Sequence, residues 1–166
     1  MNTQSAHIVL HEEDFHQFED ALRRLRMDAN ARAVFLIDKN GQQIASAGEV
    51  EGFDTTSLAS LTAGNVAATD GLAKLIGERE FSVLFHEGQR DHIHISIVGG
   101  RAILVVVFDD RSSLGLVRLR VKRANGEFER IFEEMMSRGD SGPDGQPRTS
   151  PFSEITDEDI DALFSE

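Results

Sequence analysis

The chain has 166 residues, with 29 acidic against 17 basic side chains, so its formal net charge at pH 7 is -12. Such a charge disfavours binding to nucleic acids and anionic membranes, which both require basic surfaces. The sequence contains no cysteine, which excludes disulfides, thiolate metal sites and thiol nucleophiles. The length and the 40% hydrophobic content are typical of one globular domain.

The first third of the chain predicts a helix and a hairpin. Glu12–Met27 repeats apolar side chains every three to four residues between charges, the pattern of an amphipathic helix. Two strands are expected at Ala33–Ile37 and Gln42–Ala47. The Asn40-Gly41 pair between them is typical of a type I′ hairpin turn.

A middle helix is predicted over Thr56–Gly77, after several possible N-caps in Asp54–Ser57. At about 100° per residue, one apolar side is expected to lie on the sheet. It holds Leu58, Leu61, Ala68, Leu72, Leu75 and Ile76. The opposite side is made mostly of small residues: Ser60, Ala63, Gly64, Ala67, Gly71 and Lys74.

This small-residue side is unusual for a solvated helix face, which normally carries long charged side chains. Small side chains let another backbone approach closely, so two interpretations remain. The stripe packs on another helix of the same chain, or it contacts another subunit or a partner protein. The second is favoured because the sheet-facing side is already assigned.

Three strands and a long helix are predicted next. Phe81–Phe85 and His92–Val98 have strand patterns, and the second alternates strictly between apolar and polar residues. Ala102–Phe108 is apolar on both faces, which indicates a central strand covered on both sides. A helix is expected at about Ser113–Met136. The order α-β-β-α-β-β-β-α predicts an α/β (α+β) fold, with a mostly antiparallel five-stranded sheet between helices.

A domain of residues 1–138 is expected to be followed by a flexible linker at 139–149 and an acidic tail at 150–166. From Ser137 to Glu166, eight acidic and two basic residues give -6, half of the chain's net charge. The tail also carries apolar residues at helical spacing: Phe152, Ile155, Ile160, Leu163 and Phe164. It is either a contact segment for a partner or a disordered solubilising tail, and its apolar residues favour the contact.

No catalytic constellation is recognisable. The sequence has no P-loop, no G-x-S-x-G and no H-E-x-x-H motif. His86, His92 and His94 could form a surface zinc site, but ordinary polar strand residues are the favoured interpretation. We therefore expect no catalytic residues, no cofactor and no resident metal.

Several stretches resemble the roadblock/longin-like family of small-GTPase regulators. The most specific is Asp54–Ala68, and the others are Gly71–Gly77, Phe85–Gly88, Ser113–Arg120 and Ile155–Glu166. The resemblance extends over nearly the whole chain, and its bacterial members include regulators of cell polarity and gliding motility.

The resemblance implies a cytoplasmic homodimer, able to gather at a cell pole, that stimulates GTP hydrolysis by a Ras-like small GTPase. Two subunits would pair through the middle helix and the following strand and bind one GTPase through the small-residue side. Such proteins are thought to position the GTPase's own catalytic residues without inserting an arginine finger. The tail would add a contact that affects nucleotide exchange. The alternative is a roadblock-type scaffold that activates no GTPase.

Overall fold

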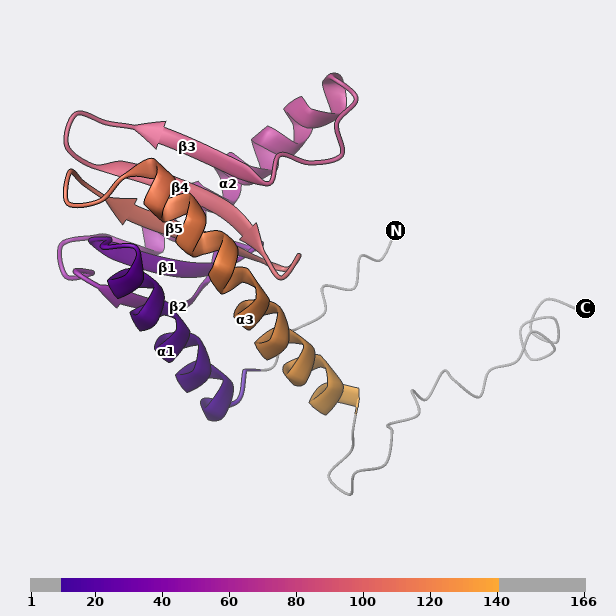
Figure 1. The fold of residues 1–166 in the computed structure, drawn as a ribbon. Coiled ribbons are helices and arrows are strands. Elements are labelled where there is room, and N and C mark those ends of the chain that lie inside the picture. Colours follow the sequence, from indigo (N-terminus) through magenta and orange to yellow (C-terminus); the bar gives the residue numbers. More distant parts are fainter. Residues whose placement is uncertain (1–9, 141–166) are drawn as a thin grey trace, which may run out of the picture.

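The computed structural model describes residues 10–140. The elements are α1 (Glu12–Asp28), β1 (Ala33–Asp38), β2 (Gln43–Gly48), α2 (Thr55–Leu75), β3 (Val83–Glu87), β4 (His92–Val98), β5 (Ala102–Phe108) and α3 (Leu114–Asp140). The strands form one sheet in the order β2-β1-β5-β4-β3, and all neighbours are antiparallel. Helices α1 and α3 cover one face and α2 lies behind the other (Figure 1). The predicted fold class and element order are confirmed.

Strand β5 occupies the centre of the sheet, as its two-sided apolar sequence predicted. All seven of its residues are buried. Leu104 and Val106 belong to the core under α1 and α3, whereas Ile103 and Val105 belong to the core under α2. The sheet therefore separates two apolar cores, and the α2 core is the smaller one.

Helices α1 and α3 pack through aromatic side chains. The Phe18 ring lies 4.9 Å from the Phe132 ring, centroid to centroid, and both side chains are buried. Where the N-terminus of α1 meets the C-terminus of α3, the fully buried Asp14 carboxylate forms an ion pair with Arg138. Helix α3 extends four residues beyond the predicted end at Met136, and this ion pair holds its last turn against α1.

The hairpin between β1 and β2 lies where it was predicted, but the turn type is different. Asn40 lacks the positive φ that a type I′ turn requires, and only Gly41 has it, at +89°. The Asp38 carboxylate accepts hydrogen bonds from the backbone N–H groups of Asn40 and Gln42, both at 2.9 Å, and this stabilises the longer turn. A Cβ on Gly41 would lie 3.3 Å from Ser60 Cα, so the turn packs closely on α2.

Among residues 10–140, no helix is long and apolar enough to cross a membrane.

Candidate protein-binding face on the middle helix

Helix α2 begins with a side-chain cap. The Asp54 carboxylate accepts a hydrogen bond from the Ser57 backbone N–H at 3.1 Å and a second from the Ser57 hydroxyl at 2.7 Å. These bonds favour the ionised carboxylate, so they lower the pKa of Asp54 below its ordinary value. The cap therefore fixes where the helix starts.

Asp54→Asn tests this cap through its pH dependence. Asparagine keeps an oxygen for the Ser57 N–H but does not titrate. The pKa of Asp54 is lower in the folded protein than its ordinary value of 3.8. The ionised carboxylate therefore stabilises the fold above about pH 3.8, and this stabilisation is lost as the pH falls through the lower pKa of the folded state. In urea unfolding between pH 7 and pH 3, we expect the stability advantage of the native protein over the variant to shrink below about pH 3.8. An advantage that does not change with pH would contradict the assignment.

The loop before α2 is held by ion pairs that the sequence did not reveal. Arg32, immediately before β1, donates a hydrogen bond to Glu49 at 3.0 Å and forms an ion pair with Asp91 at 3.0 Å. The Arg32 hydrogen bond lowers the pKa of Glu49. The guanidinium also lies 5.7 Å from the centre of the Phe53 ring. These contacts join three loops beside the entry to α2.

The side of α2 that lies on the sheet differs from the predicted one. Its buried residues are Ala59, Thr62, Val66 and Ala73. Leu58 still packs against the core, but Leu61, Leu72, Leu75 and Ile76 are exposed, by 74%, 59%, 82% and 69% of their surfaces. The prediction was wrong because α2 approaches the sheet through small and β-branched residues, which turns its larger leucines outward.

This rotation produces a leucine stripe on the outside of α2, made of Leu61, Ala68, Leu72 and Leu75. All four residues are exposed. Exposed apolar residues that gather on one surface usually mark a protein–protein contact. The sequence contained the signal for exposed leucines, because α2 has apolar residues on most of its circumference. The helical periodicity argument, however, assigned these leucines to the core.

The small-residue stripe lies beside the leucine stripe. Ser60, Gly64, Ala67, Gly71 and Lys74 are exposed, whereas Ala63 is half-buried near the Gly41 turn. A Cβ added at Gly64 or Gly71 would meet no atom within 4 Å. No helix within residues 10–140 packs on these two glycines, so the described structure gives no support to the intrachain interpretation.

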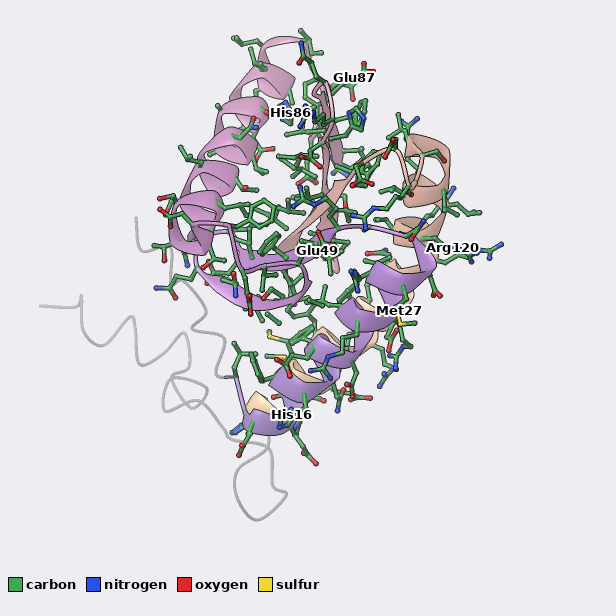
Figure 2. All side chains as sticks on the ribbon, turned by 90° about the vertical axis from the view of Figure 1, so that its left-hand side faces the viewer. His16, Met27, Glu49, His86, Glu87 and Arg120 are labelled. Carbon is green, nitrogen blue, oxygen red and sulfur yellow. The ribbon has the colours of Figure 1, made fainter. Side chains whose placement is uncertain are left out.

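Among the described strands, β3 provides a free sheet edge next to α2. It is the last strand in the sheet order, and its Val83 and Phe85 are exposed by 41% and 38%. The Asn65 amide of α2 lies 3.1 Å from Nε2 of His86, which points from β3 toward the helix (Figure 2). The C-terminal half of α2, which contains Leu72 and Leu75, extends past β3 (Figure 1).

The structure does not bring the three candidate zinc ligands together. His86 is paired with Ile93 and faces α2, whereas His94 is paired with Phe85 and lies on the opposite face of the sheet with His92. Three ligands divided between two faces cannot share one tetrahedral metal ion. The tail residues Phe152, Ile155, Ile160, Leu163 and Phe164, and almost all of the predicted linker, lie outside the described residues.

The model of the Roadblock/LC7 domain family matches residues 17–108. The chain therefore belongs to the roadblock/LC7 family, as its fold and sequence patterns indicated.

Within that family the chain is similar to structures of MglB. MglB of Myxococcus xanthus is 60% identical, with a TM-score of 0.72, and the match covers 76% of this chain and 96% of that one. The gliding protein MglB of Thermus thermophilus is 36% identical, with a TM-score of 0.70, and the match again covers 76% of this chain and 96% of the other. An MglB described with a tetrameric arrangement is 35% identical, again over these shares, with a TM-score of 0.71. A search of proteins with curated descriptions finds no significant match.

Proposed function

We propose that this protein is a homodimeric GTPase-activating protein for a Ras-like small GTPase of the MglA type. Its role is the control of cell polarity and gliding motility, in the cytoplasm and at a cell pole. The observation that carries the proposal is the outer surface of α2, where two exposed stripes lie side by side. Apart from the half-buried Ala63, the residues of both stripes are exposed in the single subunit, so each stripe is available for a protein contact.

The leucine stripe and the β3 edge supply the contact between two subunits. Leu72 and Leu75 are exposed by 59% and 82%, and burying them in a homodimer would remove apolar surface from water. The adjacent edge of β3 has unpaired backbone groups that a second copy of β3 can satisfy. Similarity to an MglB described with a tetrameric arrangement supports self-association.

The small-residue stripe supplies the contact with the GTPase. Gly64 and Gly71 leave the helix backbone open to an approaching surface, and Ala67 adds only a methyl group between them. GTP hydrolysis depends on the positioning of water and catalytic side chains around the γ-phosphate. A surface that presses on the GTPase can order those groups without a catalytic residue of its own.

A turnover assay with the cognate GTPase tests the proposed activity. We expect GTP hydrolysis to accelerate by about a hundredfold or more when the protein is added, since positioning by GTPase activators has effects of this order or larger. The scaffold hypothesis predicts binding with no acceleration. Binding with an unchanged hydrolysis rate would therefore replace the proposed function with the scaffold.

Removal of residues 150–166 tests the tail as a second contact with the GTPase. The deletion keeps the leucine stripe and β3, so we expect the subunits still to pair. The affinity for the GTPase, or the nucleotide exchange rate of the GTPase, should change. Isothermal titration and the release of a fluorescent nucleotide measure the two effects. Identical values with and without the tail would reduce it to a solubilising segment.

A further inference from the structure

A hollow of about 330 Å³ lies on the side of the sheet away from the α2 face, under the first half of α3. Ser82 and Val83 of the β3 region, His94 and Ser96 of β4, and Arg118 and Lys122 of α3 line it. One wall is held in place by Asn125, whose side-chain oxygen accepts a hydrogen bond from the Gly99 N–H at 3.1 Å. In Figure 1 the first turns of α3 cross over β4 and β5 at this position.

The floor of the hollow contains polar groups without partners. His94 is 1% exposed and Ser96 is 4% exposed. Neither ring nitrogen of His94 nor the Ser96 hydroxyl has a hydrogen-bond partner among the described residues. Buried polar groups are nearly always paired, because leaving them unpaired costs free energy. The floor therefore offers hydrogen bonds to a ligand.

The surroundings of the His94 ring favour its neutral form. Burial lowers its pKa, and the nearby charge of Arg118 lowers the pKa further. A neutral imidazole has one N–H donor, and the Ser96 hydroxyl is a second donor. Both can donate to an anionic oxygen.

The rim of the hollow is positively charged in a strongly acidic protein. Arg118 and Lys122 are one helical turn apart and exposed, and no carboxylate from the described part of the chain lines the hollow. Within residues 10–140, neither cation forms an ion pair. Val83 and Val121 add apolar surface between the rim and the floor. This combination fits a segment that carries carboxylates next to apolar side chains.

We propose that, when no GTPase is bound, the hollow holds the acidic tail of the same chain, through the stretch Asp157–Phe164. This stretch carries four carboxylates close to Ile160, Leu163 and Phe164, and so matches both the cationic rim and the apolar walls. Tethering favours this occupant over a separate acidic partner, because a linked segment acts at an effective concentration in the millimolar range.

The chain is long enough to make this contact. From Lys122 to Asp140, where α3 ends, the helix rises about 27 Å at 1.5 Å per residue. The roughly 16 residues between Asp140 and Asp157 span up to about 50 Å when extended. The tail can therefore turn back along α3 and reach the rim.

A spin label on the tail tests the proposal in the full chain. Because the protein has no cysteine, Ser165→Cys creates a unique attachment site. We expect the label to broaden the backbone amide signals of Ser96 and Lys122, and not that of Gly64 on the opposite face. Lys122→Glu should abolish most of this broadening, since it replaces attraction by repulsion. Arg123→Glu is the matched control: it makes the same charge change at the next residue, which is exposed but does not line the hollow, and it should preserve the broadening.

Signals at Ser96 and Lys122 that stay sharp in the labelled protein would overturn the proposal. So would equal losses in the Lys122→Glu and Arg123→Glu variants, which would reduce the effect to overall charge. Mixing labelled protein with isotope-enriched, unlabelled protein identifies the chain that supplies the tail. Broadening in the unlabelled copy would assign the hollow to a neighbouring subunit's tail and refute the intrachain contact. None of these results depends on GTPase activation.

Discussion

Gly71→Arg is expected to abolish GTPase binding while the protein remains folded. The position is open in the single subunit, since an added Cβ meets no atom within 4 Å. Arginine is also a better helix former than glycine, by roughly 0.5–1 kcal/mol, so the variant should unfold at an equal or higher urea concentration. On the proposed contact surface, however, the long charged side chain would block the close approach of the GTPase. We expect the affinity to fall by about a hundredfold or more, as measured by titration calorimetry and GTP turnover.

Two variants separate this effect from general changes in charge or helix stability. Gly71→Ala gains helix propensity but adds only a methyl group, so it should bind nearly as well as the native protein. Glu133→Arg introduces the same side chain at an exposed position of α3 and should leave the activity unchanged. If Gly71→Arg accelerated hydrolysis normally, the small-residue stripe would not be the GTPase contact. Ala67→Arg provides a second test on the same stripe.

The second large effect is expected from Leu72→Glu combined with Leu75→Glu. Both side chains point into solvent in the single subunit, so the substitutions should leave its fold intact. In the proposed homodimer, four leucines would lose their burial. At about 1.5 kcal/mol each, this weakens association by roughly 6 kcal/mol, a change of about 10⁴-fold in the dissociation constant. Light scattering at micromolar concentration should then show half the native mass.

Met27→Glu is the matched control for this pair. Met27 is also an exposed apolar residue, at 74%, but it lies on α1, on the opposite side of the sheet. Its substitution should leave the mass of the assembly unchanged. A native mass for the double leucine variant would exclude the leucine stripe as the subunit contact. Halving of the mass by Gly71→Arg instead would assign self-association to the small-residue stripe.

Much of the sheet could be predicted because the relevant signals are local. The alternation in His92–Val98 and the two-sided apolar run in Ala102–Phe108 predicted both strands with their observed ends. The turn between β1 and β2 was located correctly but assigned the wrong type. The Asp38 side chain, which bonds to two backbone N–H groups of the turn, decides its geometry and is not part of the Asn-Gly signal.

The candidate site was predicted only in part. The small residues of α2 could be grouped on one stripe because helical periodicity depends on the sequence alone. The separation of His86 from His94 could not be predicted, since it requires the register of β3 against β4. A shift of one residue in the pairing of β3 with β4 would have placed His86 on the face of the sheet that holds His94.

The order of the elements, the central place of β5 and the small-residue stripe follow from local sequence patterns, because each depends on a repeat within one segment. The side of α2 that lies on the sheet depends on contacts between elements. Apolar residues surround most of that helix, so hydrophobicity alone does not select a face. Packing selects it: Ala59, Thr62, Val66 and Ala73 allow α2 to lie close to the sheet, and the larger Leu61, Leu72 and Leu75 are left exposed.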